Sequence, residues 1–136
     1  ICTELDATQV GLILSATVTQ EDVPGGGCDF SQDDPRAASL SFISVEATSD
    51  SDFDATQAAS IAAAGMTDAV ETDPGIGAKS VIATGTANGG ENTQGIGIMQ
   101  DGNIIVTVTL LQGTGMDAAS VETAVNQALS LAAQKI

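Results

Sequence analysis

A tight turn at Asp101-Gly102 constrains the fold of this chain more than any other feature of its sequence. The pair lies between two runs rich in β-branched residues, and an Asp-Gly pair in that setting is typical of a two-residue β-hairpin. Because such a turn joins antiparallel neighbours, the runs at 95–100 and 103–111 are predicted to pair. The second run is mostly apolar, so we expect it to be a buried central strand.

Further strand-like runs alternate apolar and polar residues, which is the period of a half-buried strand. They lie at 16–20, around Cys28-Asp29-Phe30, at 39–47 and at 79–84. The run at 39–47 changes its apolar face near Phe42-Ile43, which predicts either a bulge or a strand buried on both faces. A loop with Gly89-Gly90 at its tip is expected at 85–92.

Three helix starts are marked by an aspartate that can accept hydrogen bonds from the first N–H groups of a helix. These residues are Asp6, Asp54 and Asp117. The element order is therefore α-β-β-β-α-β-β-β-α, and short turns between consecutive strands indicate an α+β fold. We expect an antiparallel sheet of about five or six strands with helices packed on one face.

The size and apolar content of the chain predict one folded domain spanning residues 1–136. A length of 136 residues lies within the roughly 100–200 residues of a typical domain. Ile, Leu, Val and Phe together make up about 24% of the chain, above the roughly 20% below which a highly charged chain is expected to be disordered.

The charge balance excludes several classes of function. There are 18 Asp and Glu against 3 Lys and Arg, for a net charge of −15, and the chain has no His, Trp or Tyr. A surface this negative repels phosphate, so neither nucleic-acid nor anionic-membrane binding is expected. Without histidine there is no imidazole base or histidine metal site. No run approaches the roughly 18 apolar residues of a membrane span, so direct membrane insertion of this domain is not expected.

The two cysteines, Cys2 and Cys28, indicate the compartment. An even pair without CxxC spacing in a small acidic chain predicts a disulfide, the alternative being two buried free thiols. The bridge would close a loop of about 27 residues, worth about 3.5 kcal/mol in the chain-entropy model. Because the chain begins at Ile1 without methionine, we also expect a signal or anchor segment to precede it.

Two motifs could hold a ligand. Gly113-x-Gly115-x-x-Ala118 superficially matches the dinucleotide fingerprint. That fingerprint needs a βαβ unit and an acidic residue about 20 positions on, so a turn and helix start explain the pattern better.

Asp50, Asp52 and Asp54 have the spacing that begins a calcium loop. Ala55 and Ile61 stand where an EF-hand needs glycine and glutamate, which leaves a different calcium site or a solvated loop. No other cofactor is expected.

Enzymatic chemistry has little support. A carboxylate-pair hydrolase needs two carboxyl groups about 5–10 Å apart in a cleft, and with 18 acids some pair is close in any fold. Lys79, the one internal amine, is interpreted as balancing local acids. A mimic of DNA that occupies a basic site is a further alternative, supported by charge density alone.

Several short motifs share their spacing with a known family. Cys2-x-x-Leu5 precedes the first helix, Gly27-Cys28-Asp29-Phe30 precedes an alternating strand, and Gly75-Ile76-Gly77 stands before another strand. Over most of its length the chain resembles a family of small bacterial envelope proteins of unknown function, often lipoproteins. It departs from them at Phe30, where they have Trp or Tyr, in its few lysines and in the lack of a lipobox. The resemblance implies an extracytoplasmic domain with a Cys2–Cys28 bridge and no catalytic residues.

These observations predict an extracytoplasmic binding or structural domain, which is periplasmic, secreted or tethered to the envelope. Its partner is expected to be a protein or a small ligand, and its oligomeric state is left open. The alternatives are a calcium- or small-ligand-binding module that uses Asp50, Asp52 and Asp54, and a carboxylate-pair hydrolase. A deep pocket with convergent polar groups would favour an enzyme, whereas a shallow face would favour binding.

Overall fold

The computed structural model describes residues 1–87 and 90–136, with three helices and seven strands in those ranges. In chain order they are α1 (Ala7–Leu14), β1 (Thr19–Val23), β2 (Gly27–Ser31), β3 (Ser39–Glu46), α2 (Asp52–Ala63), β4 (Val70–Thr72), β5 (Lys79–Thr86), β6 (Thr93–Asp101), β7 (Ile104–Leu111) and α3 (Ala118–Ala133). The α+β class and the antiparallel sheet are confirmed. The additional strand is β4, whose three exposed residues are too few to show a period. Gly89, at the expected loop tip, lies outside the described residues.

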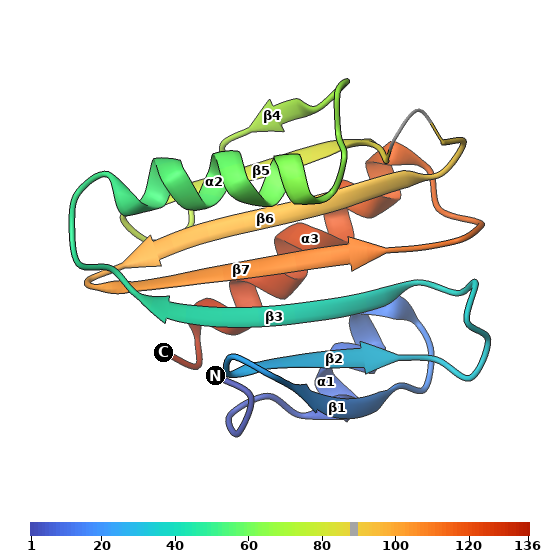
Figure 1. Ribbon diagram of the computed structural model, residues 1–136. Helices are drawn as coiled ribbons and strands as arrows, with labels where there is room; N and C mark the ends of the chain where they lie inside the picture. The colour runs from blue at the N-terminus through green and yellow to red at the C-terminus, as the bar shows by residue number, and fades with distance from the viewer. Residues whose placement is uncertain (88–89) are drawn as a thin grey trace.

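The strands pair antiparallel in the order β1-β2-β3-β7-β6-β5-β4 (Figure 1). The predicted hairpin is confirmed, because Asp101 pairs with Ile104 across the turn. Gly102 in this turn has φ of 59°, a left-handed conformation that glycine adopts at no steric cost. The first strand begins at Thr19, three residues later than the predicted run at 16–20. The predicted central strand, β7, lies in the middle of the sheet between β3 and β6.

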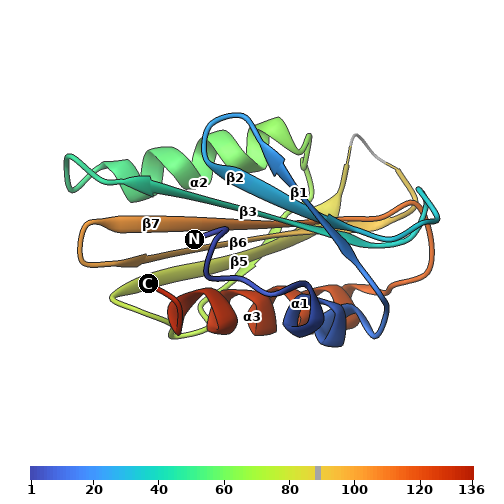
Figure 2. The ribbon, with the colours of Figure 1, turned by 90° about the horizontal axis from the view of Figure 1, so that it is seen from below.

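The helices lie on both faces of the sheet, so the expectation that they pack on one face is wrong. α1 and α3 cover one face, and α2 lies alone on the other (Figure 2). The cause is that β6 and β7 place apolar side chains on both sides of the sheet, with Met99 and Val106 in the α3 core and Ile98 and Ile105 in the α2 core. Each apolar face of a sheet needs its own covering layer.

α3 approaches β6 closely because two glycines leave room for it. A Cβ atom on Gly95 would lie 2.6 Å from Val121 Cγ1, and one on Gly97 would lie 2.6 Å from Val125 Cγ1 and 2.7 Å from Leu129 Cδ1. The helix side chains therefore occupy the space that strand side chains would otherwise fill, as close packing of a core requires.

Two of the three predicted helix caps are confirmed. Asp6 and Asp117 each accept a hydrogen bond of 2.8 Å from a backbone N–H of the helix that follows. The prediction for Asp54 is wrong, because α2 already begins at Asp52 and Asp54 lies within its first turn. No helix in the described ranges is long and apolar enough to cross a bilayer.

The close approach of α3 predicts a specific coupling. Gly97→Ala should lower the free energy of unfolding by about 1–3 kcal/mol, because the added methyl overpacks the contact. Leu129→Ala should cost about 2–5 kcal/mol on its own. In the double variant the methyl gains room, so the loss should be smaller than the two single losses together. Denaturant unfolding of the four proteins measures this coupling, and strictly additive losses would contradict it.

Candidate binding surface

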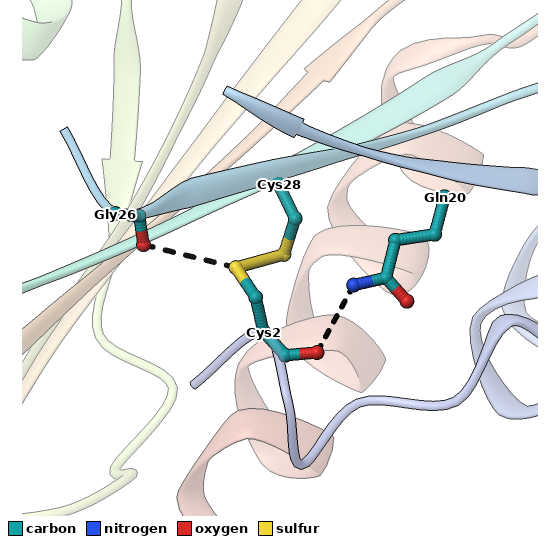
Figure 3. Close-up of a disulfide and its surroundings, with 4 residues drawn as sticks. All are labelled: Cys2, Gln20, Gly26 and Cys28. Carbon is teal, nitrogen blue, oxygen red and sulfur yellow. Dashed lines mark hydrogen bonds between the residues drawn. A yellow bond between two sulfur atoms is a disulfide. The ribbon is translucent and has the colours of Figure 1, made fainter. Parts of the chain in front are cut away.

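A disulfide joins Cys2 to Cys28, with their Cα atoms 5.8 Å apart (Figure 3). The predicted bridge is confirmed, and the alternative of two free thiols is wrong. Gln20 Nε2 donates a hydrogen bond of 3.0 Å to the Cys2 carbonyl. Cys2 Sγ also lies 3.7 Å from the Gly26 carbonyl oxygen, and because a disulfide sulfur carries no proton this is a van der Waals contact. The bridge and Gln20 tie the segment before α1 to β1 and β2.

The predicted calcium ligands Asp50, Asp52 and Asp54 do not converge. The Asp52 carboxylate accepts hydrogen bonds from the backbone N–H groups of Thr48 (2.7 Å) and Ser49 (3.1 Å). Asp50 and Asp54 are exposed, one in the loop and the other on α2. Within residues 1–87 and 90–136, no group of three or more Asp, Glu, His or Cys side chains is placed to hold a metal ion. The calcium alternative stays a prediction, and this geometry does not support it.

Hydrogen bonds give Asp52 a structural role instead. The backbone N–H of Thr48, followed by the hydroxyl of Ser49, lowers the pKa of this carboxyl from its ordinary value. Because the pKa is lower in the folded state, the carboxylate stabilises the fold above about pH 4, and this contribution is lost as pH falls through the lowered pKa. Backbone N–H groups lower the pKa of Asp68 and Asp117 in the same way. All three aspartates therefore hold loops or helix starts in place.

The glycines of the dinucleotide-like pattern lie in the loop between β7 and α3. The Gly113 N–H donates a hydrogen bond of 2.8 Å to the Arg36 carbonyl, and the buried side chain of Gln112 accepts one of 2.9 Å from the same loop. The loop is thus bonded to the protein itself. The α3 that follows packs on an antiparallel sheet, whereas the dinucleotide fingerprint belongs to a parallel βαβ unit.

The surface hollows that the structure shows are shallow and open to solvent. Five of them have volumes between about 220 and 540 Å³, and none of the five is lined by more than one carboxylate. A carboxylate-pair hydrolase needs two such groups facing one cleft, so these hollows give it no site.

Lys79 was predicted to balance nearby acids. Its Nζ lies 5.8 Å from the ring centroid of Phe53, which is a cation–π contact.

Half of the sheet lacks a covering helix on the α2 side, which the sequence did not predict. α2 packs on β6 and leaves β3, β2, β1 and most of β7 uncovered (Figures 1 and 2). Directly paired residues point to the same face, so the partner of Ile105, Val45, lies on the α2 side. Following the register outward, the side chains of this uncovered face are Thr19, Glu21, Val23, Asp29, Ser31, Ser39, Ser41, Ile43, Val45, Thr107, Thr109 and Leu111.

The centre of the uncovered face is uncharged and partly apolar. On β3 and β7 it consists of Ser and Thr together with Ile43, Val45 and Leu111, which are 40%, 44% and 48% exposed. A Cβ atom on Gly27 would lie 2.8 Å from Ile43 Cγ1 and 2.9 Å from Val23 Cγ2, so this glycine lets the two side chains close over β2. The two carboxylates of the face lie on the outer strands, β1 and β2. Ile43 and Val45 lie toward one end of β3, whereas Leu111 lies at the other end, opposite Ser39, with Ser41, Thr107 and Thr109 between them. Apolar side chains interspersed with uncharged polar ones, with charges confined to the edge, are common in protein interfaces.

The apolar residues of β3 switch from one side of the strand to the other at Phe42-Ile43, and this switch was the sequence signal from which the uncovered face could have been predicted. β3 pairs with β7 without interruption from Ser39 to Glu46, so the bulge alternative is wrong. Instead, β3 carries Leu40 and Phe42 on the core side and Ile43 and Val45 on the uncovered face. The strand has the sequence of one buried on both faces, but in the single chain one of its faces is solvated.

The disulfide makes a measurable contribution to stability. Replacing both cysteines, as Cys2→Ala with Cys28→Ala, should lower the free energy of unfolding by about 3.5 kcal/mol, because the bridge restricts a loop of about 27 residues in the unfolded chain. Reduction of the wild type should cost a similar amount. Urea unfolding with and without reductant measures both, and the double variant, which reductant cannot affect, is the control. Equal wild-type stability in the two conditions would contradict this role.

Comparisons with known proteins do not assign a function to this chain, so the assignment depends on the geometry of its surface. No protein-family model and no curated protein matches the sequence, and no solved structure matches the fold. The observations that bear on function are therefore the disulfide, the shallow hollows and the uncovered face. Of these, the uncovered face is the extended surface on which apolar side chains are exposed.

Proposed function

We propose that this chain is an extracytoplasmic binding or structural domain that acts through its uncovered face. The disulfide supports the compartment, because such bonds persist in the periplasm or outside the cell and are rare in the cytosol. The resemblance of its motifs to small envelope proteins, often lipoproteins, points the same way. The domain is accordingly periplasmic, secreted or tethered to the envelope.

The uncovered face is the observation that carries the proposal. In a chain with 18 acidic residues, the inner two strands of this face, β3 and β7, present no charge and expose Ile43, Val45 and Leu111. Exposed apolar side chains on an uncharged surface rimmed by polar residues are typical of interaction sites on soluble proteins, and burial of such side chains dominates the energy of most interfaces. Binding therefore uses an extended face, not a deep pocket.

A binding role also agrees with the shape of the surface. A small-molecule site is a concave cavity that encloses most of its ligand and brings polar groups together. The five hollows are instead open, and the one beside the disulfide is lined by Cys2, Gln20 and Asp22 among others, with no second acid or base. A partner with an extended surface of its own, such as a protein, fits the uncovered face better than a small substrate fits any of these hollows.

Native mass spectrometry of the protein purified from its own host tests the proposal. We expect a mass two hydrogens below that of the reduced chain, and a non-covalent partner that Ile43→Asp removes because it places a charge at the centre of the uncovered face. Leu12→Asp is the matched control, since Leu12 is 76% exposed on α1, across the sheet, and should keep the partner. Thiols that alkylate without reductant, or a partner retained by Ile43→Asp, would contradict the proposal.

A further inference from the structure

We infer that the Cys2–Cys28 bridge is a redox-sensitive clasp on the edge strand β1, and that a dithiol opens the clasp by attacking Cys2 Sγ. The inference goes beyond the proposed function and does not depend on what the uncovered face binds. It depends on three properties of the molecule: the weak attachment of β1, the chain of contacts that runs through the bridge, and the unequal access to its two sulfur atoms.

β1 is attached to the sheet mainly by its backbone pairing with β2. It is a terminal strand of the sheet, and none of residues 19–26, which form β1 and the turn after it, is buried. The residues that border this segment, Val18 and Gly27, are both buried, and the turn rises away from the plane of the sheet (Figure 2). A segment with few buried apolar contacts opens locally at a low cost in free energy. Residues 19–26 therefore form a flap whose two ends are fixed.

The carboxylates of the β1–β2 hairpin oppose its closure. Glu21 and Asp29 are directly paired across the two strands, and like charges in that position destabilise a strand pair. The hairpin contains no lysine or arginine that could compensate these charges. The pairing of β1 with β2 is therefore weaker than that of a neutral hairpin.

The disulfide provides a second connection between β1 and β2, apart from their backbone ladder (Figure 3). Cys28 on β2 is bonded to Cys2, and the Cys2 carbonyl accepts the hydrogen bond of 3.0 Å from Nε2 of Gln20 on β1. The contacts thus run from one strand through the bridge to the other strand. Breaking the S–S bond releases Cys2, so its carbonyl no longer has a fixed position from which to hold Gln20.

The two sulfur atoms of the bridge differ in their access to a reductant. Cys28 is fully buried. Cys2 is half-buried and lines an open hollow of about 540 Å³, which Gln20 and Asp22 also line and Cys28 does not. Thiol–disulfide exchange begins when a thiolate attacks one of the two sulfurs, and access helps to decide which one. The attack therefore takes place at Cys2 Sγ, with Cys28 as the leaving group.

The opening reaction transfers two electrons from a dithiol to the bridge. One thiolate of the dithiol bonds to Cys2 Sγ while the S–S bond breaks, and Cys28 leaves as a thiolate that takes up a proton. The second thiolate of the reductant then attacks the reductant's own sulfur in the mixed disulfide and releases Cys2, which is protonated in turn. The dithiol becomes a disulfide, and its two protons end on the two cysteines. β1 is then held by its ladder with β2 alone.

Hydrogen–deuterium exchange of the wild-type protein, with and without dithiothreitol, tests the clasp. After reduction, we expect residues 19–26 to exchange at nearly the rate of an unstructured chain, because the flap opens, while β7 and α3 remain protected. Two results would overturn the inference. One is a β1 that stays as protected as in the oxidised protein, and the other is a β1 that loses protection only together with β7 and α3.

Two variants test the same contacts with the bridge intact, so this arm does not require the reduced protein to fold. Gln20→Met removes the hydrogen bond to Cys2 and should speed exchange in β1 by about two- to tenfold, the usual effect of one hydrogen bond. Gln57→Met makes the same change on α2 and should leave β1 unaffected. Glu21→Gln removes the repulsion from Asp29 and should slow exchange in β1. Unchanged exchange in Gln20→Met, or faster exchange in Glu21→Gln, contradicts the clasp.

Mapping the first adduct of a monothiol identifies the sulfur that is attacked. Brief treatment with 2-mercaptoethanol, followed by acid quenching and peptide mass spectrometry, should give a mixed disulfide on Cys2 and a free thiol on Cys28. An adduct found mainly on Cys28 overturns the assigned route of opening.

Discussion

The β6–β7 hairpin determines the rest of the structure because its two strands place buried apolar side chains on both faces of the sheet. On one side Gly95 and Gly97 let α3 lie directly against β6, and on the other side Ile98 and Ile105 require a second layer, which α2 provides. A sheet with two apolar faces must be covered twice, and a chain of this length has one helix available for the second face. That helix covers β6 and leaves β3, β2 and β1 solvated, so the uncovered face follows directly from the construction of the hairpin.

Much of the fold could be predicted from local signals. The Asp101-Gly102 turn, the antiparallel pairing and the Cys2–Cys28 bridge each depend on residues whose chemistry has few alternatives. The placement of α2 could not be predicted, because β6 alternates isoleucine with glycine and Gly97 gives no indication that a helix packs on it. In isolation such a strand looks apolar on one face and empty on the other. The prediction for Asp54 fails because Asp52 holds the preceding loop through the N–H groups of Thr48 and Ser49, and α2 begins there with Ser51 at its N-cap.

The candidate site could be predicted less well, because it belongs to no single segment. The uncovered face combines alternate residues of four strands. Its composition depends on a register that joins β3 to β7 between residues that are 58 to 72 positions apart in the sequence. The one local sign was the change of apolar face at Phe42-Ile43. The candidates that did have local signatures are Asp50, Asp52 and Asp54 for calcium and Gly113 for a cofactor. They lie in loops or in the first turn of α2, where they are bonded to the protein's own backbone or exposed to solvent. Several of the acidic residues hold helix starts and loops, and none lies on the β3 and β7 part of the uncovered face.

Carbene footprinting tests binding through the uncovered face most directly, because it reports the exposure of individual side chains. In protein purified from its own host with its partner bound, labelling of Ile43 and Val45 should be lower than in the chain refolded alone with its disulfide intact, while labelling of Leu12, on α1 across the sheet, stays constant. Labelling of Ile43 that is equal in the two samples, or a change at Leu12 instead, would contradict this role of the face.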